Sequence, residues 1–292
     1  MWWTNAFRVA IGLLGLASGA LLAADEAGAE QQLSISDGRP VAKAVEVLSK
    51  RHGIVITYED PRYAFEGDLK DVTAAVSRSP VKPGHRVLVP RGGAMQLTYT
   101  LSPSSGKLEG LDAVVRKVLD SNVASGGGAQ FELIQQDDVL HVVPVMLKNS
   151  EGAWVATRSI LDTPITLPME SRSGLQTVDA ICNALSAAAK VNVGITMAPT
   201  NALASYQVVE GGTNEPARDI LSRSLKQLSK GMASRLGENY ERQYVWQLLF
   251  DPGIKTYALN LSLLPQAEVV TQRRKEERLD HAAQDPDTSR PR

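Results

Sequence analysis

The strongest constraint on the fold is an order of helices and strands that runs through the sequence twice. In the first half, apolar residues at helical spacing in PVAKAVEVLSKRHG precede the β-branched run IVITY, and the same succession appears in GLQTVDAICNALSAAAK and VNVGITM. Each half then continues with a strand, a second amphipathic helix and two closing strands. Because the order βαββαββ agrees in both halves, we predict an internal repeat. The expected fold is α+β: two tandem small modules, each with two helices packed on one face of a small mixed sheet.

The repeat sets the expected domain boundaries. We predict the first module over 30–147, a linker over 148–160 and the second module over 161–264. The first module is longer because a segment rich in Pro and Gly lies at about 69–93, which predicts an inserted loop or a protruding hairpin. Insertions of this kind are more often functional than the scaffold around them, and tolerated variation is the plain alternative.

Both ends of the sequence differ from the repeat. Arg8 precedes the apolar run VAIGLLGLASGALL, which is shorter than the ~20 residues of a membrane-spanning helix and has the length of a signal-peptide core. We therefore predict a signal peptide over 1–29, cleaved after Ala24 or Ala29, a periplasmic or exported location, and no stable membrane span once it is removed. An uncleaved anchor is the alternative. Charges of both signs crowd 265–292, which predicts a disordered tail.

Composition excludes several classes of protein. Apolar residues make up 43% and charged residues 22%, as in ordinary globular proteins. The formal net charge of −1 provides no excess of cations for nucleic acid or anionic lipid. The single cysteine, Cys182, cannot form an intrachain disulfide, and its place on one helical stripe with Val178 and Leu185 predicts a buried structural thiol.

The residue types that usually carry catalysis are scattered along the chain. The sequence has four histidines: His52, His85, His141 and His281. They show no metal-ligand spacing, so we predict neither a metal site nor a cofactor. We expect His52 to cap the first helix and His141 to be an ordinary residue of a strand face. Asp137 and Asp138 adjoin in a hairpin turn, where solvated acids are the rule. We assign no catalytic residue and do not expect an enzyme.

The apolar pattern of the repeat resembles a known family. The segment RPVAKAVEVLSKRHGIVITY at 39–58 is similar to the start of the secretin and TonB short N-terminal domain, and GLDAVVRKVL at 110–119 looks like its second helix. GLQTVDAI at 174–181 and PARDIL at 216–221 are similar in the second half. The resemblance covers most of 33–145 and, more weakly, 161–264. It departs from the family in that the module is doubled and that no secretin ring or outer-membrane barrel sequence follows.

The resemblance implies a function in docking. Modules of this family occur at the periplasmic end of secretins and of some TonB-dependent receptors. It implies a non-catalytic exported adaptor of the periplasm or envelope that associates with a secretion or TonB-type transport or signalling system. The implied partner is an envelope protein, the secretin or TonB-dependent machinery; self-association is left open, and nucleic acid is not expected. The alternatives are a stand-alone ligand-binding module and a periplasmic enzyme. The enzyme would require His85, His141 or Asp137 to meet serine or cysteine side chains in a pocket.

The surfaces expected to bind the partner are the insertion, the linker and the sheet edges. Cations outnumber acids in the insertion, so its basic surface would steer an acidic partner. An aromatic residue in a linker either packs into a groove, which is commoner, or contacts a partner. An exposed edge of a small sheet can accept a strand. The candidate partner-binding residues are Arg78, Lys82, Arg86, Arg91 and Trp154.

Overall fold

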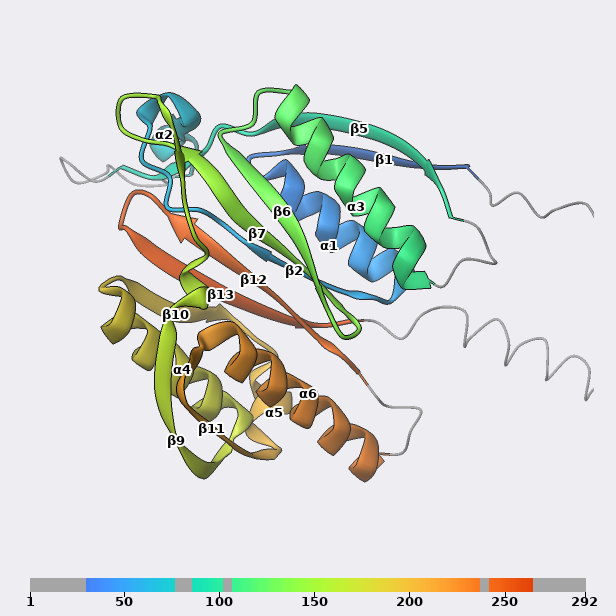
Figure 1. Cartoon of the computed structure of the whole chain (residues 1–292), viewed down its shortest axis with the longest axis vertical. Coiled ribbons are helices and arrows are strands. Elements are labelled where there is room, and N and C mark those ends of the chain that lie inside the picture. Colours follow the sequence, from blue (N-terminus) through green and yellow to red (C-terminus); the bar gives the residue numbers. More distant parts are fainter. Residues whose placement is uncertain (1–29, 77–85, 102–106, 237–241, 265–292) are drawn as a thin grey trace, which may run out of the picture.

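A computed structural model of the chain describes residues 30–76, 86–101, 107–236 and 242–264 (Figure 1). The predicted signal peptide over 1–29 and the predicted tail over 265–292 lie outside the described residues. None of the described helices has the length and apolar character needed to cross a membrane.

The described part of the first half carries two long helices and seven strands. Its elements are β1 (Glu30–Asp37), α1 (Pro40–His52), β2 (Val55–Glu59), η1 (Glu66–Asp68), β3 (Leu69–Asp71), α2 (Thr73–Val76), β4 (Leu88–Pro90), β5 (Gly93–Thr100), α3 (Lys107–Ala124), β6 (Ala129–Gln136) and β7 (Val139–Lys148). β1 pairs antiparallel with β5, β2 runs parallel to β7, and β7 runs antiparallel to β6. Within the predicted insertion, β3 pairs antiparallel with β4.

The second half has a similar content. Its elements are β8 (Trp154–Ala156), η2 (Ile160–Asp162), β9 (Pro164–Ser173), α4 (Gly174–Ala189), β10 (Asn192–Met197), α5 (Thr200–Ala204), β11 (Gln207–Pro216), α6 (Ala217–Leu236), β12 (Tyr244–Asp251) and β13 (Thr256–Leu263). β9 pairs antiparallel with β11, β10 runs parallel to β13, and β13 runs antiparallel to β12. β8 lies in the predicted linker and pairs antiparallel with the end of β7. The expected α+β class is confirmed.

The helix ends follow local sequence signals, with one exception. Gly53 ends α1 with a φ of +66°, a left-handed conformation that glycine adopts without a steric penalty. At the start of α4, the side chains of Ser173 and Gln176 each bond the backbone of the other, which forms a capping box. Asn214, a residue type that favours helix N-caps, instead lies in β11 with a φ of +55°, and α6 begins at Ala217. The helix begins later because β11 and its pairing with β9 extend past Asn214.

One continuous sheet joins the two halves (Figure 1). The strand order is β10-β13-β12-β2-β7-β6, and β8 pairs beside β7 as the seventh strand. The join is the parallel pairing of β12 with β2, in which Gln247 lies opposite Tyr58 and Leu248 opposite Glu59. The sequence predicted a small separate sheet for each module. Two of the expected edges are therefore not available to a partner, because they pair with each other.

The long helices cover both faces of this sheet. Successive side chains of a strand point to opposite faces. On β2, Ile56 and Tyr58 belong to the core formed with α1 and α3, whereas Glu59 binds Arg218 of α6. Accordingly, α1 and α3 lie on one face and α4 and α6 on the other (Figure 1). The strand pairs β1–β5 and β9–β11 contact the outer sides of the helices.

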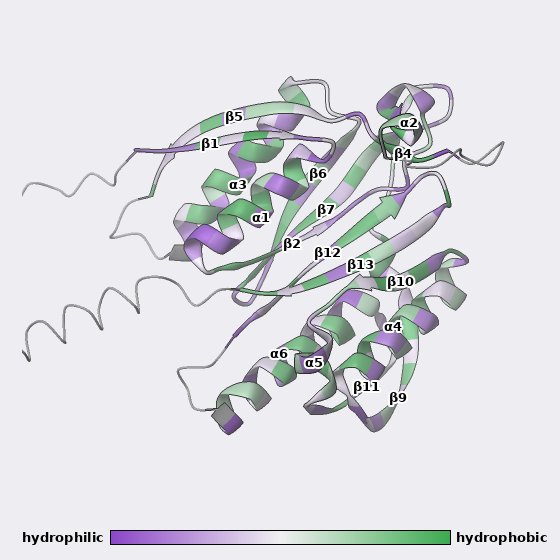
Figure 2. Cartoon of the chain, turned by 180° about the vertical axis from the view of Figure 1, so that it is seen from behind, coloured by the Kyte–Doolittle hydropathy of each residue, from purple (hydrophilic) through white to green (hydrophobic). Residues whose placement is uncertain are grey.

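Two apolar cores fill the spaces between these layers, and Figure 2 shows hydrophobic stretches along the strands between the helix pairs. Trp246 and Phe250 of β12 belong to the core of the second half, and each is 2% exposed. Cys182 is buried in the same core, as predicted. Burial raises the pKa of its thiol to about 12, so the reactive thiolate is strongly disfavoured.

Candidate functional site

The described partner-binding candidates gather at one end of the first half. Arg78 and Lys82 lie outside the described residues. Arg86 is exposed, and its guanidinium is 3.0 Å from Asp71 and 3.8 Å from Glu66. Much of the positive charge predicted for this part of the insertion is therefore balanced locally.

Trp154 lies close to the same region, because Lys148 contacts both its ring and Asp68 beside the insertion. The Nζ of Lys148 lies 5.3 Å from the centre of the Trp154 ring and 5.6 Å from that of Phe65, and it pairs with Asp68 at 2.8 Å. Asp68 immediately precedes the insertion. Trp154 remains 41% exposed, so it is not packed into a groove as the commoner alternative held. Trp154 and the insertion are separated by about half a module along the chain, and Lys148 brings them together in the fold.

A cavity of about 340 Å³ opens beside the insertion. Pro90, Arg91 and Gly92 line one side, and the glycines 126–128 line another. Arg91 is exposed and donates to the backbone oxygen of Leu69 at 3.3 Å. The glycine loop at 126–128 thus forms part of the wall of this cavity.

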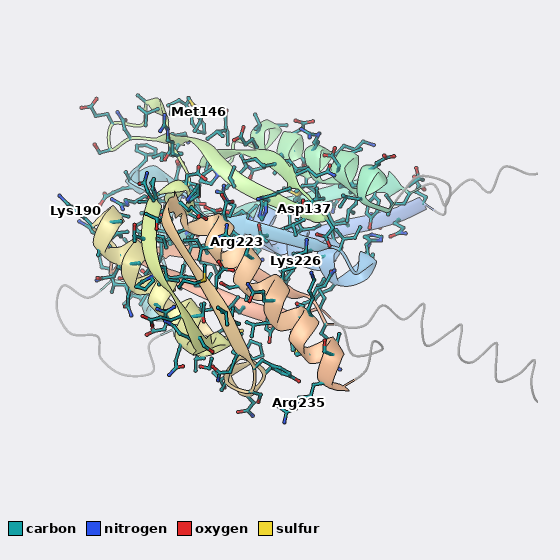
Figure 3. The ribbon with its side chains drawn as sticks, turned by 60° about the horizontal axis from the view of Figure 1, so that its bottom comes forward. Asp137, Met146, Lys190, Arg223, Lys226 and Arg235 are labelled. Carbon is teal, nitrogen blue, oxygen red and sulfur yellow. The ribbon has the colours of Figure 1, made fainter. Side chains whose placement is uncertain are left out.

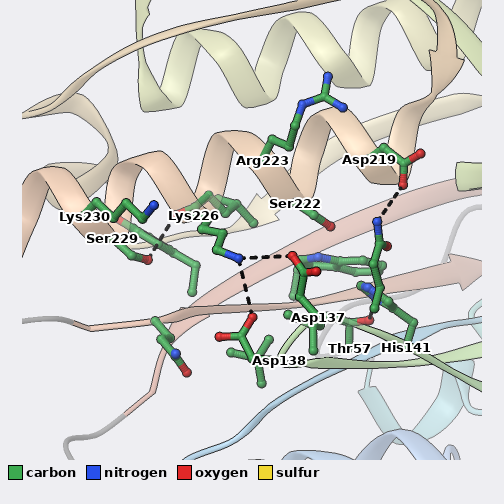
Figure 4. A pocket seen from close by; sticks show the side chains of 17 residues that line it. Thr57, Asp137, Asp138, His141, Asp219, Ser222, Arg223, Lys226, Ser229 and Lys230 are labelled. Atoms are coloured by element: carbon green, nitrogen blue, oxygen red, sulfur yellow. Dashed lines mark hydrogen bonds and ion pairs between the residues drawn. The ribbon is translucent and has the colours of Figure 1, made fainter.

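A second cavity, of about 350 Å³, lies between the two halves (Figure 4). It is bounded by β2 and β7 of the first half, the turn between β6 and β7, and α6 and β12 of the second half. Its apolar lining consists of Val55, Val139, Leu225, Tyr244 and Trp246. This interdomain pocket exists only because β12 pairs with β2 and thereby places α6 over the open face of β2 and β7.

His141 lies at the base of the interdomain pocket and is 1% exposed. Its Nδ1 is 2.7 Å from the hydroxyl of Thr57, and its ring centre is 5.9 Å from that of Trp246. Its Nε2 is buried and has no hydrogen-bond partner among the described atoms. Burial, together with the charge of Arg218, lowers the pKa of His141 to about 4, so the ring is neutral at pH 7. From the sequence we expected an ordinary strand position here, and no local pattern marked this residue.

The mouth of the interdomain pocket carries an ion-pair cluster between the halves. Lys226 on α6 lies 3.2 Å from Asp137 and 3.7 Å from Asp138 (Figures 3 and 4). The two turn acids are exposed as predicted, and they also contact the second half. Arg223 points away from the pocket in Figure 4 and pairs with Glu210 and Glu215 instead.

The pocket collects several of the groups that an enzyme would require. Asp137, His141, Ser222 and Ser229 all line it. However, no hydrogen bond between His141 and a serine is present in the described part of the chain, and the hydroxyl of Ser229 donates to the backbone of Leu225. Ser222 Oγ is buried without a partner in the same set of atoms. The arrangement offers hydrogen bonds to a bound molecule rather than an assembled nucleophile and base.

A buried ion pair lies close to this pocket. The guanidinium of Arg218 donates to Glu59 at 2.9 and 3.0 Å and to Asp162 at 2.5 Å, and Ser159 also donates to Glu59. Removal from water raises the pKa of Glu59 to about 7 even though Arg218 favours its charged form. Within the described ranges, no cluster of three or more potential metal ligands is present.

A second polar network lies at the next residue, Asp60, which directly follows β2. Asp60 accepts from the Nε of Arg39 at 2.5 Å, from Tyr58 at 2.7 Å and from the backbone N–H of Phe250 at 3.0 Å. Arg39 also donates to the backbone oxygen of Phe250 at 2.7 Å. Charged side chains thus fasten the end of β2 to both α6 and β12 of the second half.

No protein-family model, no curated protein and no solved structure matches this chain.

Proposed function

We propose that this chain is a non-catalytic, exported docking protein of the periplasm or envelope, built from two tandem βαββαββ modules. Its partner would be an envelope protein of a secretion or TonB-type transport system. The resemblance of the sequence to the short N-terminal domain of secretins and TonB-dependent receptors supports the choice of partner class.

The strand pairings support the tandem modules. In each half, the first and third strands of the βαββαββ order pair antiparallel: β1 with β5, and β9 with β11. The second strand runs parallel to the last: β2 to β7, and β10 to β13. The last two strands pair antiparallel in both halves. Superposing 33–145 on 161–264 in an experimental structure tests the repeat, and a mismatch of these strands would contradict it.

The exposed pair Trp154 and Val155 carries the docking proposal. These side chains are 41% and 37% exposed on β8, next to the insertion. Large aromatic side chains that stay accessible beside a polar rim are the usual anchors of protein interfaces. Lys148 restrains the Trp154 side chain, because its Nζ contacts the Trp154 ring and pairs with Asp68.

The surrounding charges define the kind of partner. Lys70 and Arg91 are exposed on the insertion, whereas Arg86 is balanced by Asp71. The partner surface that fits would place an apolar group against Trp154 and acidic groups near Lys70 and Arg91.

Site-specific crosslinking in native envelopes tests the proposal. A photoreactive phenylalanine analogue replaces Trp154 in one variant and Met169 in a matched control, since Met169 is also apolar and is 67% exposed on β9. We expect a discrete crosslinked envelope protein from position 154 and none from position 169.

A shortened insertion provides the second arm. Replacing 72–87 with Asn-Gly keeps Asp71 opposite Leu88 and closes the β3–β4 pair with a two-residue turn. We expect this folded variant to lose the crosslink from position 154. Equal crosslinking from positions 154 and 169, or an undiminished crosslink in the shortened variant, would contradict docking at this surface.

A further inference from the structure

We propose that the interdomain pocket is a binding site for a small, uncharged, planar aromatic molecule that carries one hydrogen-bonding group such as a hydroxyl. This inference goes beyond the docking proposal and does not depend on it, because the pocket and the surface around Trp154 share no residue.

The size and lining of the pocket fit an aromatic body. Its volume of about 350 Å³ is at the lower end of the range of roughly 300–1,000 Å³ for small-molecule sites, which suits one or two fused rings. Trp246 and His141 line the pocket and pack against each other with ring centres 5.9 Å apart and an interplanar angle of 31°, and Val55 and Val139 add aliphatic surface. A planar apolar ring can pack against such a lining.

Two polar atoms of the pocket lining lack a hydrogen-bond partner that a ligand could provide. His141 Nε2 and Ser222 Oγ are both buried, and neither has a hydrogen-bond partner in the described structure. A buried polar atom without a partner costs free energy, and a native protein normally satisfies it. The two atoms come from opposite walls, His141 from β7 and Ser222 from α6 (Figure 4). One hydroxyl or amide group of a bound molecule would satisfy one or both of them.

The charges favour a neutral ligand. Lys226 is occupied by Asp137 and Asp138 at the mouth, and Arg223 points away from the pocket. The other two charged lining residues are Asp219, which accepts from Gln136 at 3.4 Å, and Lys230, which is exposed to solvent. His141 is neutral at pH 7, because burial and Arg218 lower its pKa. The base of the pocket therefore provides no charge to compensate a buried ionic group, and such a group would pay a large desolvation penalty.

A set of three probes tests the chemistry of the site. 2-Naphthol matches the proposed ligand, naphthalene lacks the hydroxyl, and 2-naphthoate replaces the hydroxyl with a charge. Binding to the mature chain is followed by NMR, with the indole N–H signal of Trp246 as the reporter of the site. We expect 2-naphthol to bind saturably and about five- to tenfold more tightly than naphthalene, as one hydrogen bond provides. We expect 2-naphthoate to bind most weakly of the three.

Variants locate the binding. Ser222→Ala removes one unsatisfied hydroxyl from a partly exposed helix position, so it should fold, and it should reduce the preference for 2-naphthol over naphthalene. His141→Phe keeps a ring and removes Nε2, and should abolish what remains of the preference. Ser222→Phe fills the pocket and should abolish binding of both probes. Ser234→Phe is the matched control, because Ser234 is exposed on the same helix and does not line the pocket.

Three results would overturn the inference. The first is that wild-type protein shows no saturable shift of Trp246 with 2-naphthol. The second is that Ser222→Phe binds the probes as well as Ser234→Phe does. The third is that Ser222→Ala and His141→Phe both leave the preference for 2-naphthol unchanged. Loss of the crosslink from position 154 would leave these outcomes unaffected, so the two proposals fail separately.

Discussion

Arg218 of α6 and Glu59 of β2 form a buried ion pair that joins the two halves of the molecule, with N–O distances of 2.9 and 3.0 Å. Removing Arg218 leaves the buried Glu59 carboxyl without its partner, so it must either stay charged and poorly solvated or take up a proton. We expect Arg218→Met to lower the free energy of unfolding by about 3–5 kcal/mol, as for other broken buried pairs. Chemical denaturation monitored by circular dichroism measures the change.

Two further variants separate the pair from the rest of the helix. Arg223→Met is the control, because its side chain is 45% exposed and its partner Glu210 keeps hydrogen bonds from Gln227 and the backbone of Gly211, so its loss should cost about 1 kcal/mol or less. The double variant Glu59→Leu, Arg218→Met removes both charges and should recover most of the stability lost in Arg218→Met. An equal decrease in the free energy of unfolding in Arg218→Met and Arg223→Met would show that the buried pair contributes no more to stability than an exposed one.

His141 should make the protein sensitive to acid. Its pKa is about 4 in the folded chain, against 6.5 for a solvated imidazole, so the unfolded chain binds the proton more tightly. The stability that the neutral ring contributes is present above pH 6.5 and is lost as the pH falls from 6.5 towards 4, by up to about 3 kcal/mol.

Comparison with His141→Phe isolates this contribution. Glu59 acts in the opposite direction, because its raised pKa contributes stability that is lost as the pH rises from 4.5 to about 7. The difference between wild type and His141→Phe cancels this effect. We expect that difference in the free energy of unfolding to change between pH 7 and pH 4, and a constant difference would argue against a neutral buried ring.

Gly92 and Gly93 offer a matched pair of substitutions at the end of the insertion. Gly92 has a φ of +49°, and a Cβ there would lie 2.2 Å from the backbone oxygen of Asp37, whereas a Cβ at Gly93 meets nothing within 4 Å. We expect Gly92→Ala to cost about 2–4 kcal/mol from backbone strain and overpacking, and Gly93→Ala to cost far less. Thermal unfolding compares the two, and similar melting temperatures would contradict the close approach.

Cys182 should be inert and structural. Its thiol is 2% exposed, and burial raises its pKa to about 12. Cys182→Ser places a hydroxyl among apolar side chains and should cost roughly 1–3 kcal/mol if no hydrogen-bond partner is found. Labelling with a bulky thiol reagent should be slow in the native protein and fast after denaturation. Rapid native labelling would show that the thiol is accessible.

Local periodicity predicted which segments form helices and strands better than it predicted which strands pair with each other. The helical stripe of Val178, Cys182 and Leu185 is a property of one short segment, and its burial is confirmed. The join of β12 to β2 depends on which strand meets which edge, and side-chain period does not determine this. The sequence held one signal of this join: the run IVITY at 54–58 lacks the alternation of a strand with one solvated face. In the structure, β2 is accordingly buried at all five positions.

The interdomain pocket was not predictable for the same reason. Arg218 follows Pro216 in the first turn of a helix, where an arginine normally lies at the surface. It is buried because Glu59, 159 positions earlier, lies beneath it. His141 and Ser222 likewise line one pocket only because α6 covers β7. In contrast, Trp154 became a candidate from its place in the linker alone, where an aromatic residue either packs into a groove or contacts a partner.

The join between β12 and β2 also has a consequence for how the chain folds. Asp60 and Phe250 are 190 positions apart, and the strands on either side of them form the centre of the sheet. Contacts of such high sequence separation close slowly, because a long loop must be ordered before they form. Until the last strands are available, the edge of β2 stays open and can pair with another chain. The protein is therefore expected to be most prone to aggregation as a nearly complete chain whose final hairpin has not yet docked.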